Sequence, residues 1–223
     1  MQSQYAVVCF DLLGHGRSPN PSGDRTLDDF ARQLDGLISE LGIARYHLVG
    51  FSLGALIALY KAVSTPDQLL SLVLLHSVFE RSEEQLAAIE SRYQLTRDQG
   101  PMATVEVAIK RWFSSDWVDR NPETIESIRQ VFRAHSDDGY LKAYRVFCDA
   151  DDEIRQLNLA NVGCKSLMIT GSLEPGSTPA MSESLAQKLG GDVIINEGHL
   201  HMALVEHADV LMSQVKQFME QSK

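Results

Sequence analysis

Short apolar runs alternate along the chain with longer segments whose apolar residues recur at helical spacing. The apolar runs cover residues 5–10, 46–50, 69–75, 165–170 and 192–196. Runs of this length are typical of strands buried on both faces of a parallel sheet. The strand–helix–strand–helix order therefore predicts an α/β fold, with a mostly parallel sheet and helices on both faces.

Capping residues mark where the predicted helices begin and end. Thr26 is placed to cap a helix that Gly42 ends, and Thr178 with Pro179 starts another that runs to Leu189. Two further helices are expected from the turn at residue 52 to about residue 63, and from about residue 208 to 221.

The segment 82–159 departs from this alternation because it contains only helical patterns. Ser82 and Gln85 match a capping box, and Asn121-Pro122 is typical of a helix start. We therefore predict a helical lid of residues 82–159, inserted into a core formed by residues 1–81 and 160–223. Such a lid would cover the carboxyl ends of the strands, where open α/β sheets bind ligands.

Charge and composition narrow the classes of partner. The chain carries a net charge of −10, which argues against binding to nucleic acid or to an anionic membrane. No apolar run approaches the length of a membrane span, and the first residues lack the basic segment of a signal peptide. Cys9, Cys148 and Cys164 are odd in number and widely spaced, which predicts buried, unpaired thiols in a cytoplasmic protein.

The stretch Gly50-Phe51-Ser52-Leu53-Gly54 carries the strongest candidate chemistry. It matches G-x-S-x-G and lies between a predicted strand and a predicted helix. In this context Ser52 would project from a helix N-terminus, where the backbone N–H of Leu53 and the helix dipole can stabilise an oxyanion. The alternative is an ordinary serine that caps the helix.

This arrangement resembles the nucleophile elbow of the α/β-hydrolase fold family, and the resemblance covers essentially the whole chain. FDLLGHGRS (10–18) is similar to the family's D-x-x-G-x-G-x-S loop, in which His15 is expected to pack the loop. The resemblance implies that residues 5–10 correspond to the family's fourth strand. The fold would then be N-terminally truncated, because three strands and the second oxyanion donor would precede Met1.

The missing strands would leave residues 5–10 without their usual neighbour. This segment would then be unpaired or would pair directly with residues 46–50. Unpaired strand edges expose backbone groups and favour association. If the short chain is genuine, we expect low stability or a homo-oligomer that covers the exposed edge.

The resemblance also implies an acid that follows the strand at 165–170, since the family order is serine, acid, histidine. Glu174 stands where the family usually has aspartate, and a glutamate can orient a histidine in the same way. Glu80, which follows the preceding strand, is an alternative acid.

The implied base follows the last strand, where three histidines are available. Glu206 stands five residues after His201, a frequent spacing in the family, and this favours His201 as the base. His199 is the alternative because it forms a Gly-His pair that is also common there. His207 is expected on a helix surface.

The segment IKRWFSSDWVDRNPETI (109–125) resembles the lid of 3-oxoadipate enol-lactonase-like hydrolases. The resemblance implies hydrolysis of a small ester or lactone by a Ser52–His201–Glu174 triad through an acyl-enzyme, with no metal or cofactor. Arg111 is a candidate for binding a substrate carboxylate. The side chains expected to bind substrate are Phe51, Arg111, Trp112, Phe113 and Trp117.

Three alternatives stay open at this point. The aromatic residues of the predicted lid would also fit a purely structural role, in which Trp112 and Phe113 pack the lid on the core. A carbon–carbon bond hydrolase would use the same triad. A truncated or non-catalytic hydrolase-fold binding protein would keep these residues without turnover.

Overall fold

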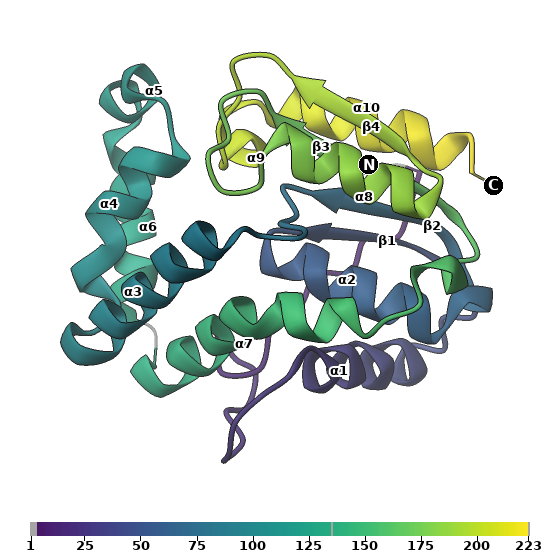
Figure 1. Cartoon of the computed structure of the whole chain (residues 1–223), viewed down its shortest axis with the longest axis horizontal. Helices are drawn as coiled ribbons and strands as arrows, with labels where there is room; N and C mark the ends of the chain where they lie inside the picture. Colours follow the sequence, from purple (N-terminus) through teal and green to yellow (C-terminus); the bar gives the residue numbers. More distant parts are fainter. Residues whose placement is uncertain (1–3, 135, 223) are drawn as a thin grey trace.

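A four-stranded parallel sheet forms the centre of the computed structural model, which describes residues 4–134 and 136–222. The strand order is β1–β2–β3–β4 (Figure 1). Four of the five predicted strands are confirmed to within one residue at each end. Their bounds are β1 (Tyr46–Phe51), β2 (Leu69–Leu75), β3 (Lys165–Gly171) and β4 (Asp192–Asn196).

The helices begin at the residues that the capping signals indicate. The side chains of Thr26, Ser82 and Thr178 each accept a hydrogen bond from the backbone N–H three residues further on. No helix in the described part of the chain is long and apolar enough to cross a membrane. The α-helices are α1 (Leu27–Glu40), α2 (Leu53–Ser64), α3 (Glu83–Gln99), α4 (Met102–Trp112), α5 (Ser115–Arg120), α6 (Pro122–Ala134), α7 (Asp137–Arg155), α8 (Pro179–Leu189), α9 (Ala203–Glu206) and α10 (Ala208–Glu220).

Alternate side chains of the central strands enter two separate apolar layers. Leu72 and Leu74 of β2 pack with α1, α2, α7 and α8 on one face of the sheet. Val73 and Leu75 pack with α10 on the other face. The period of two along a strand therefore gives a sheet covered on both faces, as predicted.

The chain between β2 and β3 is helical, from α3 to the short turn η2 (Leu159–Asn161). Helices α4, α5 and α6 share an apolar cluster of their own, centred on Val105, Ile109, Phe113 and Ile125. Helix α7 instead packs beside α1 and α2, whereas α4, α5 and α6 stand at one end of the sheet (Figure 1).

The predicted strand at residues 5–10 is wrong. These residues pair with no described strand, and Val7, Val8 and Phe10 are exposed. A strand exists only through its ladder of hydrogen bonds to a neighbour, so an apolar run alone does not make one. The same segment leaves Cys9 exposed, where a buried thiol was expected.

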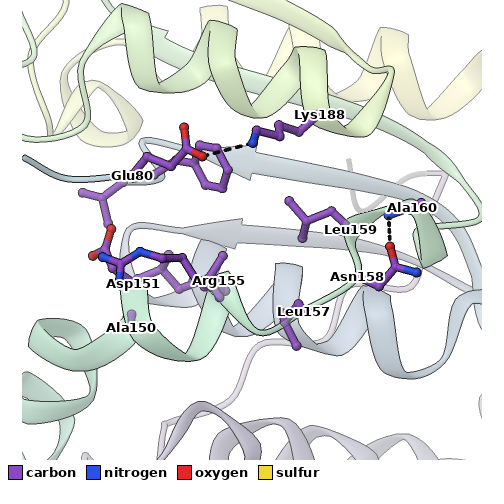
Figure 2. A pocket seen from close by; sticks show the side chains of 13 residues that line it. Glu80, Ala150, Asp151, Arg155, Leu157, Asn158, Leu159, Ala160 and Lys188 are labelled. Carbon is purple, nitrogen blue, oxygen red and sulfur yellow. Dashed lines mark hydrogen bonds and ion pairs between the residues drawn. The ribbon is translucent and has the colours of Figure 1, made fainter.

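A side cavity of about 350 Å³ lies against α7, α8 and the loop after β2 (Figure 2). Glu80 and Lys188 form an ion pair at its wall, with 3.2 Å between Oε1 and Nζ. The Ser184 hydroxyl also donates a hydrogen bond to Glu80. Glu80 is therefore engaged with α8.

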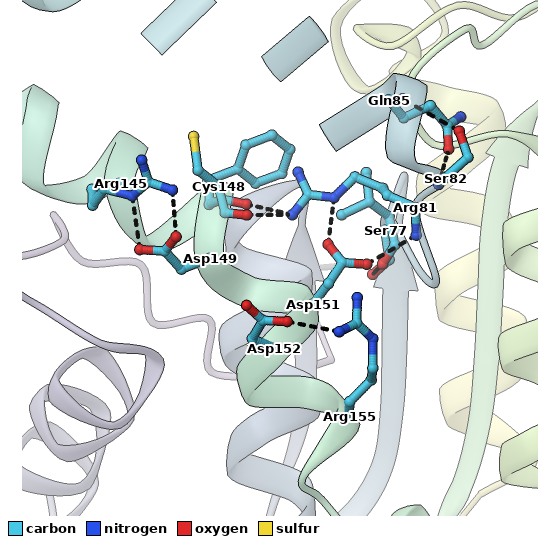
Figure 3. A network of polar contacts seen from close by, with 12 residues as sticks. Ser77, Arg81, Ser82, Gln85, Arg145, Cys148, Asp149, Asp151, Asp152 and Arg155 are labelled. Carbon is cyan, nitrogen blue, oxygen red and sulfur yellow. Dashed lines mark hydrogen bonds and ion pairs between the residues drawn. The ribbon is translucent and has the colours of Figure 1, made fainter. Parts of the chain in front are cut away.

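A buried ion pair fastens the loop after β2 to α7 (Figure 3). Arg81 donates from its side chain and its backbone N–H to Asp151, the latter bond being 2.9 Å long. Its Nη2 also donates to the carbonyl oxygens of Phe147 and Cys148, at 2.7 and 3.1 Å. Because both charged side chains are buried, the loss of one partner would leave an uncompensated charge in the core.

Replacement of Asp151 by alanine is expected to lower the free energy of unfolding by about 3–5 kcal/mol, because it leaves the buried charge of Arg81 without a counter-charge. The neighbouring variant Asp152→Ala is the matched control. It removes a carboxylate that is 76% exposed and paired with Arg155, so we expect a change below about 1 kcal/mol. Urea denaturation followed by circular dichroism measures both values, and equal losses would contradict the role given to the buried pair.

Candidate active site

Ser52 lies in a sharp turn between β1 and α2. Its backbone has φ 53° and ψ −118°, a conformation that costs a non-glycine residue about 1–3 kcal/mol. The Ser52 N–H still donates to the carbonyl oxygen of Leu75 in β2, at 2.9 Å. The Ser52 side chain makes no capping hydrogen bond, so the structure contradicts the alternative of an ordinary helix cap.

Close packing of β1 against α2 explains Gly50. A Cβ atom there would lie 2.2 Å from the Gly54 carbonyl oxygen and 2.6 Å from the Ala55 Cα, both of which are backbone atoms. A Cβ at Gly54, by contrast, would meet no heavy atom within 4 Å among the described residues, apart from its chain neighbours and the backbone of its own helix. The first glycine of the motif is therefore required by packing, and the second has room for a methyl group.

A cavity of about 510 Å³ opens beside this turn. Its wall on the sheet side includes Ser52, Leu53, Glu174 and His201, which follow three different strands. Its opposite wall comes from α3, α4 and α7 and is largely apolar. A mostly apolar cavity with a few convergent polar groups is typical of a small-molecule site.

The loops after β3 and β4 bring Glu174 and His201 together. Nδ1 of His201 lies 2.9 Å from Oε2 of Glu174, and the backbone N–H of Gly176 donates to Oε1 at 2.7 Å. Burial acts to raise the pKa of Glu174, but the contacts with His201, His76 and Gly176 outweigh it and hold the pKa well below its ordinary value. Glu174 is therefore ionised at neutral pH and can orient the imidazole.

Aromatic rings and the helical segment hold His201 from its other sides. The ring centroids of Phe51 and Trp112 lie 5.0 and 6.0 Å from that of His201. The next residue, Met202, donates its N–H to the carbonyl oxygen of Trp112 at 2.9 Å. The orientation of His201 thus depends on β1 and on α4 as well as on Glu174.

His76 belongs to the same cluster, and the sequence analysis missed it. It directly follows β2 with φ 50°, its side chain is 1% exposed, and its Nδ1 lies 3.4 Å from Oε2 of Glu174. Burial lowers the pKa of His76. A titratable residue directly after a buried parallel strand was the available signal, because that is where such sheets bind ligands.

His76, Glu174 and His201 lie close enough together that they could also hold a metal ion. One candidate ligand atom from each lies within 4.8 Å of the other two. Two imidazoles and one carboxylate are a known donor set for zinc. A cation bound through the Nδ1 atoms would displace the protons through which the rings contact Glu174, so it would compete with the hydrogen-bonded arrangement.

A family model of the α/β-hydrolase fold matches residues 2–208. The chain belongs to the α/β-hydrolase fold family. The resemblance drawn from the elbow motif is thereby confirmed for the fold.

Three similar proteins place this hydrolase-fold chain more closely. 3-Oxoadipate enol-lactonase 2 of Acinetobacter baylyi is 27% identical over 188 residues, which cover 84% of this chain and 68% of the relative. The (E)-2-((N-methylformamido)methylene)succinate hydrolase of the same organism is 28% identical over 199 residues, covering 89% and 74%. The enol-lactonase structure from Burkholderia xenovorans has a TM-score of 0.83 at 26% identity, covering 94% of this chain and 79% of that one. These names support a hydrolase activity.

The alternative acid and base of the hydrolase-fold site lie elsewhere in the structure. Glu80 is exposed beside the side cavity, where it contacts α8 (Figure 2). The His199 ring stacks on that of His207, with 4.0 Å between centroids, and it does not line the cavity that contains Ser52. The geometry therefore favours Glu174 and His201 over both alternatives.

The residues expected to bind substrate separate into two groups. Arg111 and Trp112 line the cavity. Phe113 and Trp117 do not, and the expectation is corrected for them: their rings stack at 4.9 Å within the apolar cluster of α4–α6. A group of small helices needs its own core, and these large rings fill it. Phe51 also lies off the cavity wall, against the rings of His76 and His201.

Two arginines give the cavity an excess of positive charge. Arg92 and Arg111 line it, and within residues 4–134 and 136–222 neither has a carboxylate within 4.0 Å. Burial lowers the pKa of Arg111, and the nearby charge of Arg92 lowers it further. Guanidinium groups nevertheless stay protonated in proteins, so this part of the cavity is suited to an anion.

Gly50→Ala is expected to destabilise the fold by at least about 2 kcal/mol, because the new methyl group overlaps the backbone of α2. Gly54→Ala has open space and a helical position, so it should stabilise the chain by about 0.5–1 kcal/mol. Urea unfolding of the two variants is the test. Similar effects of both would show that the packing of β1 on α2 does not set the elbow.

Proposed function

We propose that this chain is a serine hydrolase that cleaves a small ester or lactone, with Ser52 as nucleophile, His201 as base and Glu174 as acid. The observation that carries the proposal is the shared cavity. The strained turn of Ser52 and the hydrogen-bonded pair of His201 and Glu174 line the same space, although they come from different strands.

In the proposed reaction, Nε2 of His201 takes the proton of Ser52 as Oγ attacks the acyl carbon. The oxyanion that forms faces the N-terminus of α2, where the N–H of Leu53 belongs to the first helical turn and has no intrahelical acceptor. His201 then returns the proton to the leaving oxygen, and the Ser52 ester remains. A water molecule that His201 deprotonates attacks this ester and releases the acid.

The helical segment 82–159 would act as the lid of this site. It supplies Arg92, Arg111 and Trp112 to the cavity wall opposite Ser52. We propose that the lid selects substrate and the core residues 1–81 and 160–223 supply the chemistry. The division of the cavity wall between sheet loops and helices supports this assignment.

The charge of the cavity favours a substrate that carries a carboxylate. Arg92 and Arg111 are half-buried, lack a carboxylate partner among the described residues and share one wall. An anionic substrate would supply the missing charge, and arginine binds carboxylates through paired hydrogen bonds. The names of both curated relatives contain such acids, 3-oxoadipate and succinate.

A fluorophosphonate probe should label the native chain at Ser52, because the reagent requires an activated serine. The variant Ser52→Ala should not be labelled, and Ser184→Ala, which removes a half-buried serine on α8 away from the Ser52 cavity, should label normally. Intact-mass measurement and peptide mapping give the site and the stoichiometry. A folded chain that remains unlabelled would contradict the proposal and favour a non-catalytic hydrolase-fold binding protein.

Arg111→Gln should impair the hydrolysis of an anionic ester more than that of a neutral one. With mono-p-nitrophenyl succinate, kcat/KM should fall by about 10–100-fold, since a charge-assisted hydrogen bond is lost. With p-nitrophenyl butyrate of similar length, the change should stay within about threefold. Arg155→Gln, on the side cavity, is the control. Equal losses on both esters would argue against carboxylate binding by Arg111.

A further inference from the structure

Four nitrogen donors surround the Glu174 carboxylate, and His201 is the one among these four that belongs to the proposed triad. The backbone N–H groups of Gly176 and Ser177 donate to Oε1 at 2.7 and 3.2 Å. The rings of His201 and His76 both approach Oε2, with Nδ1 at 2.9 and 3.4 Å. Two imidazoles therefore converge on a single carboxylate oxygen.

The neighbours of His76 fix the position of its proton. The Thr170 hydroxyl donates to the carbonyl oxygen of Ser177 at 2.7 Å, so its oxygen can only accept from His76 Nδ1, which lies 3.5 Å away. Glu174 Oε2 is also an acceptor. Nδ1 of His76 thus faces two acceptors and must carry the proton.

The surroundings of the other ring nitrogen favour a neutral His76. Its Nε2 is buried and has no hydrogen-bond partner in the described structure. In the protonated ring this atom would be a buried N–H without an acceptor, which is costly. The lowered pKa of His76, for which burial is the largest cause, agrees with a neutral ring.

The backbone places this ring despite strain. His76 has φ 50°, in the left-handed region that a non-glycine residue rarely adopts, while its N–H donates to the Ile169 carbonyl oxygen at 2.8 Å. Phe51 contacts the ring edge to face, with 5.8 Å between centroids. A strained backbone conformation persists where many surrounding contacts hold it in place, and such positions are often found at functional sites.

A glutamate needs such support more than an aspartate would. Its side chain has one more rotatable bond, so it loses more conformational freedom when it is fixed. We propose that His76 is a positioning residue, whose neutral Nδ1–H holds Oε2 of Glu174 in the orientation that His201 requires. The inference rests on the proposed function, because it assigns His76 a role through the acid of that triad.

The charged and titratable groups around His76 define the expected pH effect. Glu174 and His201 contact it directly, His199 acts on it at longer range, and Arg111 acts on Glu174. Without the His76 donor, the Glu174 carboxylate accepts one hydrogen bond fewer. The protonated form of the neighbouring base is then favoured, so activity should be lost at a higher pH on the acid side.

Kinetics of His76→Phe and His76→Asn with p-nitrophenyl butyrate test this role. His76→Phe keeps a ring without a donor: kcat should fall about tenfold with a smaller change in KM, and the acidic limb of kcat/KM should move up by about 0.5–1 pH unit. His76→Asn can place an amide N–H near the lost Nδ1 and should recover kcat to within about threefold of the native value. His47→Asn, in β1, is the control for loss of an imidazole.

A measurement without substrate separates this inference from the proposed function. Long-range ¹H–¹⁵N correlation spectra of the native chain, assigned with His76→Asn, should show His76 as the neutral Nδ1–H tautomer at pH 7. That tautomer should persist below the pH at which an ordinary histidine is protonated, near 6.5. The spectrum is informative even if the chain proves inactive or if His76→Phe fails to fold.

Two results would overturn the inference. One is an Nε2–H tautomer, or ordinary titration of His76, in the native chain. The other is a folded His76→Phe variant whose kcat and acidic limb match those of the native chain. An unlabelled native chain that shows the expected tautomer would instead reject the proposed function, and with it the catalytic purpose of the contact, while the contact between His76 and Glu174 itself would stand.

Discussion

Three backbone hydrogen bonds that continue the sheet beyond its strands hold the whole site. Ser52 donates to Leu75, His76 donates to Ile169, and Ser172 donates to Asn196, at 2.8–2.9 Å. Each donor is the first residue after its strand, so the parallel ladder ends at the same level in neighbouring strands. The chain then turns sharply, with positive φ at Ser52 and His76. Side chains distant in sequence thus meet at one edge, and their positions are as fixed as the sheet itself.

The charge that faces the cavity is opposite in sign to the net charge of the whole chain. The protein carries a net charge of −10, yet Glu174 is the only carboxylate among the described lining residues, and its charge is already shared by four donors. Arg81 lines the cavity too, but Asp151 neutralises it. Arg92 and Arg111 also face the cavity, and no carboxylate of the described residues lies within 4.0 Å of either. A low-dielectric wall strengthens their attraction for an anion.

Much of the fold could be predicted from the sequence because its signals are local. Apolar runs and capping residues such as Thr26 and Thr178 depend on adjacent residues, and these elements are confirmed. Residues 5–10 carry the same apolar signal but form no strand. A strand needs a neighbour to pair with, and the apolar run alone does not indicate whether one is present. The proximity of Glu174 and His201 could be expected because the chain has its serine, acid and histidine in the same order as the α/β-hydrolase family. His76 could not be assigned in this way, because its role depends on a turn and on contacts made across the sheet.

Direct contacts join the helical segment 82–159 to the loop that carries the proposed base, His201. Trp112, at the end of α4, contacts the His201 ring and accepts a hydrogen bond from the N–H of Met202. Glu206 accepts a further bond from the N–H of Ser114, at 2.6 Å. A shift of α4 would therefore move the loop that carries His201, while Glu174 stays fixed by its own loop and by His76. The contact between His201 and Glu174 is thus where the position of α4 and the geometry of the proposed triad meet, and the donor proposed on the sheet side, His76, would keep Glu174 in place when α4 moves.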